Sequence, residues 1–218
     1  MTQGKPLPAN LVQRYADWKA TKFVKNKALY QQLAEEGQHP QAMVISCCDS
    51  RVHATAFFGD DPGAFFIHRN IANLVPPYKT DGDQHGTSAA IEYAVRVLKV
   101  THIIILGHSG GGGVYGAYQM CNGDAPELEQ KSSFVGRGGD ILRPGYERVA
   151  GKGSTEEQIA ALEREGVLLS MENLMGFPFV RDAVTADTLS IHGMWTNIGD
   201  GSLFHFDGTA FVPVAEKG

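Results

Sequence analysis

Apolar residues recur at helical spacing near the start of the chain. Leu11, Tyr15 and Trp18 fall on one helical face, and two later leucines continue the pattern. Residues 1–36 therefore predict two helices or one broken helix. A stretch with glycine and proline at 37–40 ends this region.

Beyond residue 40, short apolar runs alternate with helical patterns. The runs at 43–45, 64–67 and 103–106 predict strands. The last run is continuous and β-branched, which is typical of an interior strand of a parallel sheet, and a helical apolar face precedes it. Residues 114–118 predict a further helix. Residues 122–153 are rich in Gly, Asp and Pro and predict a loop with short helical pieces.

Two signals mark the last third of the chain. Ser154 and Glu157 have the spacing of a capping box, which predicts that a helix begins there. The segments 189–196 and 203–206 flank a polar turn and predict a hairpin. Because strands and helices alternate, we expect an α/β fold with a mainly parallel central sheet flanked by helices, preceded by N-terminal helices and closed by a late antiparallel strand or hairpin.

Length and composition limit the class of protein. A chain of 218 residues with 43% hydrophobic residues can bury one substantial core, so we expect one domain with a helical arm (1–36) and an α/β core (37–218). The formal charge of −5 disfavours nucleic-acid and anionic membrane partners, which need a basic face. No apolar stretch approaches the ~20 residues of a membrane-spanning helix. The three cysteines cannot all pair and the N-terminus is polar, so we expect a cytoplasmic protein.

Two of the predicted strands end in residues that carry chemistry. Cys47, Asp49 and Arg51 follow the first run, and His108 with a run of glycines follows the run at 103–106. A thiolate and an imidazole are good zinc ligands, and a carboxylate beside a guanidinium can orient a metal-bound water. Each piece alone is more often packing or an ordinary ion pair. Open parallel sheets place their sites at the carboxyl ends of strands, so the combination is more specific than its parts.

The combination resembles the β-class carbonic anhydrases. Cys-x-Asp-Ser-Arg followed by a Gly-His-Ser glycine-rich turn is similar to the motifs of that family, and the resemblance runs over roughly residues 30–207. Further matching segments lie at 68–77, 88–94, 172–174, 178–180 and 192–195. Bicarbonate-regulated members carry a Trp three residues before the first Cys ligand, where this chain has Val44, so it looks like the plant-like type. The resemblance implies reversible hydration of carbon dioxide to bicarbonate by a zinc-bound hydroxide.

The resemblance also implies roles for single residues. Cys47 and His108 match zinc ligands, and Asp49 and Arg51 match the catalytic dyad, in which the carboxylate accepts a hydrogen bond from the hydroxide. The family's small apolar pocket for carbon dioxide is matched by four further residues, Gln38, Phe66, Ile71 and Tyr93. The family residue whose backbone N–H lies near the substrate is matched by Gly112.

The chain departs from the family at one zinc ligand. The family's second motif is His-x-x-Cys, and its cysteine corresponds here to Gly111, which has no side chain to offer. Asp49 is the leading substitute, because some family members move this aspartate onto zinc in an inactive closed form. Alternatively, Asp49 stays with Arg51 and two waters complete the zinc shell.

Three other residues are weaker candidates for the missing ligand. Cys48 neighbours Cys47 on an extended segment, so its side chain should point to the opposite face. Cys121 lies ten residues after Gly111, and a helix would carry it away from the site. His53 corresponds to ordinary loop in the family.

Three functions remain open from the sequence. The first is a carbonic anhydrase with an altered and weakened zinc shell, and the second is an inactive homologue that acts as a binding or structural protein. The third is a phosphate- or nucleotide-binding module built on glycines 110–113, which is disfavoured because no Lys-Ser or Lys-Thr pair follows them. The resemblance further implies a homodimer or higher homo-oligomer. The apolar face of Leu11, Tyr15 and Trp18, which has no evident partner in so short a segment, agrees with that expectation.

Overall fold

The computed structural model describes residues 4–59, 61–81 and 85–215. The chain divides into two compact units, Met1–His39 and Pro40–Gly218, and each is described by itself. This division falls close to the boundary expected from the sequence. That the two units form one domain stays a prediction.

The N-terminal unit is helical, as predicted. It contains α1 (Ala9–Trp18), the π-helical turn η1 (Lys19–Phe23) and α2 (Lys27–Glu36). Trp18, Phe23 and Tyr30 pack together, with ring centroids 5.2 to 6.0 Å apart. Of the predicted apolar face, Leu11 and Tyr15 remain exposed within this unit.

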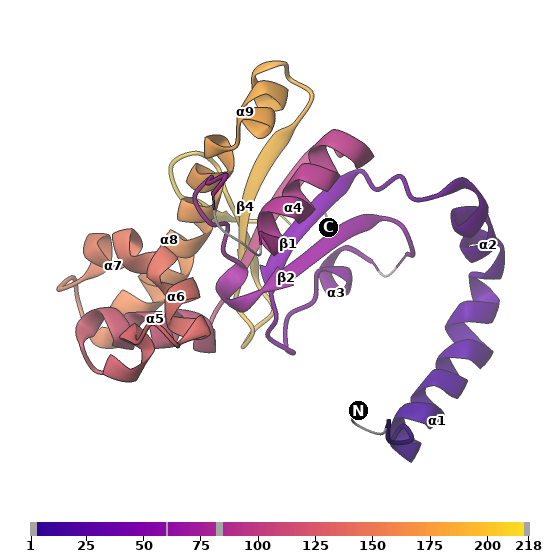
Figure 1. The fold of residues 1–218 in the computed structure, drawn as a ribbon, viewed down its shortest axis with the longest axis horizontal. Coiled ribbons are helices and arrows are strands. Elements are labelled where there is room, and N and C mark those ends of the chain that lie inside the picture. The colour runs from indigo at the N-terminus through magenta and orange to yellow at the C-terminus, as the bar shows by residue number, and fades with distance from the viewer. Residues whose placement is uncertain (1–3, 60, 82–84, 216–218) are drawn as a thin grey trace. The chain divides into compact units, whose positions relative to one another are not determined.

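The larger unit is built on one six-stranded sheet (Figure 1). Its strands are β1 (Ala42–Cys47), β2 (Phe65–Asn70), β3 (His102–His108), β4 (Ser190–Thr196), β5 (Leu203–Phe206) and β6 (Phe211–Pro213). The order is β2-β1-β3-β4-β5-β6; the pairings from β2 to β4 are parallel and the last two are antiparallel. The expected parallel sheet and the late hairpin are therefore confirmed, and β6 is an addition that the hydrophobic pattern did not reveal.

Helices follow most of the strands. They are α3 (Ala54–Phe58), η2 (Ile71–Asn73), α4 (Gly86–Glu92), η3 (Tyr93–Leu98), α5 (Gly112–Asn122), η4 (Pro126–Glu129), α6 (Phe134–Gly139), η5 (Asp140–Leu142), α7 (Arg143–Val149), α8 (Thr155–Gly176) and α9 (Pro178–Thr185). Four of them fill the segment that was expected to be a loop with short helical pieces. The capping box at the start of α8 is confirmed: Ser154 N–H donates to Glu157 Oε2 at 2.7 Å, and Glu157 N–H donates to Ser154 Oγ at 3.2 Å.

The two faces of the sheet are covered differently. On one face, side chains of β1 and β3 pack with apolar residues of α4, η3, α8 and α9, so this face is deeply buried. The other face carries a smaller cluster around Val44 and Leu106, covered in part by α3. A third cluster joins α5, α7 and α8. Among the described residues, no helix is long and apolar enough to cross a membrane.

Candidate active site

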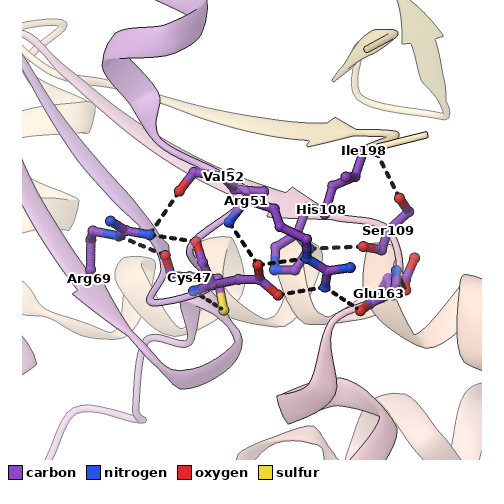
Figure 2. Close-up of polar contacts among 10 residues, drawn as sticks. Cys47, Arg51, Val52, Arg69, His108, Ser109, Glu163 and Ile198 are labelled. Atoms are coloured by element: carbon purple, nitrogen blue, oxygen red, sulfur yellow. Dashed lines mark hydrogen bonds and ion pairs between the residues drawn. The ribbon is translucent and has the colours of Figure 1, made fainter. Parts of the chain in front are cut away.

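The parallel register brings Cys47 and His108 to one edge of the sheet. Ser46 of β1 lies opposite Leu106 of β3, so the last residues of these neighbouring strands leave the sheet side by side. Both side chains are buried, with 5% and 3% of their surface exposed. In Figure 2 the side chains of Cys47, His108 and Arg51 lie close to one another.

The thiol of Cys47 and the imidazole of His108 polarise each other. Burial opposes ionisation of Cys47, but the hydrogen bond with His108 and the backbone N–H groups of Asp49 and Ala72 lower its pKa overall. Burial likewise opposes protonation of His108, yet its bonds with Cys47 and with the Ser109 carbonyl raise its pKa. Each of the two groups therefore stabilises the charged form of the other.

The dyad that the sequence predicted is formed. Arg51 Nε donates to Asp49 Oδ1 at 2.9 Å, and Nη2 donates to Oδ2 at 2.7 Å, so the guanidinium holds the carboxylate in a two-pronged pair. Hydrogen bonds from the Arg51 side chain and backbone keep the pKa of Asp49 far below its ordinary value. Arg51 Nη2 also donates to the Gly110 carbonyl at 2.9 Å, which links the two strand-end turns.

Arg69 of β2 organises the first turn. Its guanidinium donates to the carbonyls of Cys47, Asp49 and Val52 at 2.7 to 2.8 Å, as Figure 2 shows. One cation thereby fixes three backbone acceptors of the segment that carries the thiol and the dyad. The sequence pattern gave this residue no role.

Glu163 of α8 organises the second turn. Its Oε1 accepts the Gly110 N–H at 2.6 Å, and the Gly111 N–H also interacts with the carboxylate. The side chain is buried, with 5% exposed, and burial raises its pKa above the ordinary value although these amides partly offset the shift. The Ser109 hydroxyl adds a further tie, because it accepts the Ile198 N–H at 2.9 Å.

The predicted pocket residues meet only in part. Phe66 and Tyr93 lie together, with ring centroids 5.9 Å apart. Ile71 lies against Gly113, where an added Cβ would stand 2.5 Å from Ile71 Cγ2. Ile71 and Tyr93 are 51% and 46% exposed, so they form an open apolar surface in the described residues of this unit. Gln38 belongs to the N-terminal unit, and its role stays a prediction.

A left-handed turn follows Ile71 and was not foreseen. Ala72 and Asn73 adopt φ values of 63° and 51°, which residues other than glycine seldom adopt. The Asn70 side chain closes this turn, because its Oδ1 accepts the Leu74 N–H at 2.9 Å and its amide donates to the Leu74 carbonyl at 2.7 Å. The turn directs the Ala72 N–H toward the sulfur of Cys47.

Comparison with known proteins assigns the family. A model of the carbonic anhydrase family matches residues 42–203, which contain both strand-end turns. The chain belongs to the β-class carbonic anhydrases. Beta carbonic anhydrase 3 of Arabidopsis thaliana is 37% identical over 183 residues, 82% of this chain and 69% of that protein. Beta carbonic anhydrase 5, chloroplastic, of the same plant is 34% identical over 192 residues, and the match spans 88% of this chain and 62% of that protein.

Solved β-carbonic anhydrases share the fold. The β-carbonic anhydrase CcaA superposes with a TM-score of 0.84 at 27% identity and covers 95% of this chain and 92% of its own. The enzyme CafA of Aspergillus fumigatus gives a TM-score of 0.78 at 29% identity, over 93% of this chain and 91% of its own. A tetrameric β-carbonic anhydrase of Sordaria macrospora gives 0.72 at 30% identity, over 94% and 98%.

The donor atoms of this β-carbonic anhydrase fit a zinc ion with two protein ligands. His108 Nδ1 donates to the Ser109 carbonyl at 2.9 Å, which leaves Nε2 as the metal-binding nitrogen beside Cys47. Both carboxylate oxygens of Asp49 are engaged by Arg51. Over the described ranges, no group of three or more His, Cys, Asp or Glu side chains gathers closely enough to hold a metal.

Gly111 stands beside His108, as the family motif implies for the residue at this position. It adopts φ −75° and ψ 118°, and a Cβ built on it would lie 3.4 Å from His108 Nε2 and 3.1 Å from Cε1. Of the other cysteines, Cys48 is exposed where Cys47 is buried, and Cys121 is half-buried in α5.

Arg69 and Glu163 are the residues that reasoning from the sequence missed. Arg69 lies inside a segment that matches the family, and only its place on β2, next to the first turn, reveals its contacts. Glu163 opens the charged run Glu163-Arg164-Glu165 of α8 and is nevertheless buried. Because charged runs on helices are usually exposed to solvent, no feature of the sequence marks this carboxylate as the one with a buried partner.

Proposed function

We propose that this protein catalyses the reversible hydration of carbon dioxide to bicarbonate, with zinc bound by Cys47 and His108. The observation that carries the proposal is the meeting of these two donors with the Asp49–Arg51 pair at one edge of the sheet. Membership of the β-carbonic anhydrases supports hydration of carbon dioxide as the reaction. A bound zinc ion lowers the pKa of its water from about 15.7 to near 7 and so supplies the nucleophile at neutral pH.

Asp49 acts as a fixed hydrogen-bond acceptor. Its low pKa keeps the carboxylate ionised at neutral pH, so Asp49 accepts hydrogen bonds and has no proton to donate. The two-pronged pair with Arg51 fixes the orientation of its carboxylate plane. An acceptor held in this way orients the attacking oxygen toward the carbon of the substrate, which lowers the entropic part of the barrier.

The Asp49–Arg51 pair favours one of the two arrangements of the zinc shell. Because Arg51 engages both carboxylate oxygens, we propose that Asp49 stays with Arg51 and that waters complete the shell beside Cys47 and His108. Compared with a shell that has a second thiolate, this shell carries one more unit of positive charge. Such a site would hold its metal less tightly and would make a metal-bound water more acidic.

Apolar side chains and a backbone amide hold the substrate. Phe66, Ile71 and Tyr93 offer the apolar surface for carbon dioxide, and Gly112 is the first residue of α5, where backbone N–H groups lack partners within the helix. The exposure of Ile71 and Tyr93 supports a homodimer or larger assembly in which a second copy completes the pocket. Gln38 is proposed to line the same pocket.

The decisive experiment compares the native protein with Gly111→Cys. A thiol at residue 111 starts from a Cβ beside His108, so zinc affinity should rise at least tenfold and the hydration rate should increase. Gly112→Cys is the matched control for zinc content, because a Cβ at residue 112 meets no atom within 4 Å, whereas a Cβ at residue 111 lies 3.4 Å from His108 Nε2. Zinc content by mass spectrometry and stopped-flow hydration are the measurements.

Two results would count against the proposal. Native protein that retains well under one equivalent of zinc after purification in zinc-containing buffer would favour the inactive homologue. A Gly111→Cys protein that binds zinc no better than the control would show that residue 111 does not face the metal.

A further inference from the structure

A second group of imidazoles lies at the other edge of the sheet. His102 is the first residue of β3 and His108 is the last, so the two are ~20 Å apart along the strand. His102 Nδ1 lies 2.7 Å from Ser190 Oγ and 3.2 Å from His192 Nε2, and Ser190 Oγ lies 2.9 Å from His192 Nε2. Three donor atoms thus form a small triangle that plays no part in the proposed hydration reaction.

The strand register fixes this triangle. His102 of β3 lies directly opposite Ser190 of β4, and Ile104 lies opposite His192. Residues two apart on a strand share a face, so Ser190 and His192 both project on the side that His102 occupies. The parallel ladder therefore preorganises the donors, and the ring centroids of the two histidines are 5.3 Å apart.

The triangle has more contacts than protons to fill them. Each contact needs a proton on one of its two atoms, and an imidazole nitrogen is either a donor or an acceptor. The serine supplies one proton, and only one of the two facing nitrogens can carry another if they are to bond each other. Two protons serve three contacts, so one proton is shared, and the Thr101 carbonyl 3.4 Å from Ser190 Oγ is a further acceptor for the serine proton.

A divalent metal ion resolves this deficit. Ligands at 2.0 to 2.1 Å from a metal lie about 2.9 to 3.4 Å apart in octahedral or tetrahedral shells, and the observed separations of 2.7 to 3.2 Å approach that spacing. We propose that His102 and His192, with the Ser190 hydroxyl between them, form a peripheral site for a borderline transition-metal ion such as Ni²⁺, Cu²⁺ or Zn²⁺, the ions that imidazole ligands suit.

The surroundings agree with this class of ligand. Both histidines are exposed, so a hydrated ion reaches them. Burial, then the charges of His102 and His205, lower the pKa of His192, which favours the neutral imidazole that metal binding requires. The described residues add no third His, Cys, Asp or Glu close enough, so water fills the remaining positions. The site is open and ties β3 to β4.

The test titrates the 218-residue protein, loaded with one equivalent of zinc for the proposed catalytic site, with Ni²⁺ by isothermal titration calorimetry. One Ni²⁺ should bind, and His102→Ala and His192→Ala should each weaken binding at least tenfold, with a smaller loss for Ser190→Ala. His53→Ala is the matched control, because His53 is an exposed imidazole whose Nδ1 lies 2.8 Å from the Thr55 hydroxyl and which, among the described residues, belongs to no cluster of histidines, and this variant should leave binding unchanged.

Two further arms separate this site from the proposed catalytic one. Cys47→Ser should keep the Ni²⁺ site, and Co²⁺ added to the protein that retains Cys47 and carries one zinc should show no thiolate charge-transfer band of the kind that coordination by Cys47 would produce. Hydration activity should be unchanged in His102→Ala and His192→Ala. Should either alanine variant fail to fold, His102→Gln and His192→Gln replace it. Native-strength Ni²⁺ binding in both histidine variants, or its loss in Cys47→Ser, would overturn the proposal.

Discussion

The two turns that build the active site are held by opposite charges. The first turn, Cys47 to Val52, presents backbone carbonyls to the guanidinium of Arg69. The second turn, after His108, presents backbone amides to the buried carboxylate of Glu163. Each turn has its unpaired backbone groups satisfied by a charged side chain from a neighbouring element, and such bonds are stronger than neutral ones. The two turns that carry the predicted zinc ligands are therefore positioned by side chains of β2 and α8 that bind their backbone.

The largest expected effect is at Arg69. Arg69→Ala leaves three carbonyls without their donor, so the free energy of unfolding should fall by about 3 kcal/mol. Urea denaturation measures this value. Arg96→Ala is the control, because Arg96 is exposed and pairs with Glu92 on the same helical surface, and it should cost less than about 1 kcal/mol. Equal losses in the two variants would contradict a special role for the first turn's cation.

The second largest loss of unfolding free energy is expected at Glu163. Glu163→Ala removes the acceptor for the Gly110 amide, which should cost about 2 kcal/mol, while Glu163→Gln keeps an acceptor and should cost less. A pocket of about 300 Å³ borders this carboxylate and lets water replace part of the lost contact in the alanine variant. If the glutamine variant proves as unstable as the alanine variant, the amide contact is not what Glu163 contributes.

The pH dependence of stability sharpens the role of Glu163. The pKa of Glu163 is raised in the folded state. At pH values between its ordinary pKa and this raised pKa, the folded protein therefore binds more protons than the unfolded chain. The contribution of this group to stability is therefore greatest below the ordinary pKa and is lost as pH rises through the raised one. Glu163→Gln should flatten this decline. Denaturation midpoints measured from pH 4 upward, in native and variant protein, report the difference.

The packing of the second turn gives a third test. Gly113→Ala places a Cβ 2.5 Å from Ile71 Cγ2 and 3.3 Å from the Ala72 nitrogen, so unfolding free energy should fall by about 1.5 kcal/mol. Gly112→Ala is the neighbouring control, since a Cβ there meets no atom within 4 Å, and its effect should stay within about 0.5 kcal/mol. Thermal unfolding of both variants separates close packing from a general need for glycine.

Arg51 should have the smallest effect on stability. Its side chain is 52% exposed, so Arg51→Ala should change the free energy of unfolding by less than about 1 kcal/mol although it removes the partner of Asp49. The hydration rate should nevertheless fall by on the order of a hundredfold, because the acceptor loses its orientation. Arg51→Lys keeps the positive charge but cannot form the two-pronged pair with Asp49, so its hydration rate should be little higher than that of Arg51→Ala. A variant that stays fully active would remove Arg51 from the proposed mechanism.

Local patterns predicted much of the fold. The capping box at Ser154 and the continuous β-branched run before His108 are signals contained in a few adjacent residues, and both produced the expected elements. The strand ends that carry Cys47 and His108 could be placed together because neighbouring parallel strands end at one edge. Strand β6 carries no such signal, since it has only three residues and ends in proline.

The supporting contacts could not be predicted in the same way. Glu163 is separated from Gly110 by 53 positions, and Arg69 reaches Cys47 across 22, so no local spacing joins them. The left-handed conformation of Ala72 is also hidden, because alanine gives no sign of a positive φ. These features depend on the packing of α8 and on the turn after β2, which appear only once the sheet has formed.

The backbone at Gly111 bears on how this chain can evolve. Its φ of −75° lies in a region open to every L-residue, whereas Gly110, one position earlier, adopts φ 63°. The codons for glycine and cysteine can differ in a single base, so one point mutation would return the family's thiol to a loop that needs no rebuilding beyond a small shift of the His108 ring. Selection for tighter metal retention would meet no structural barrier here, and lineages that keep glycine under such selection would indicate that the weaker hold is itself of use.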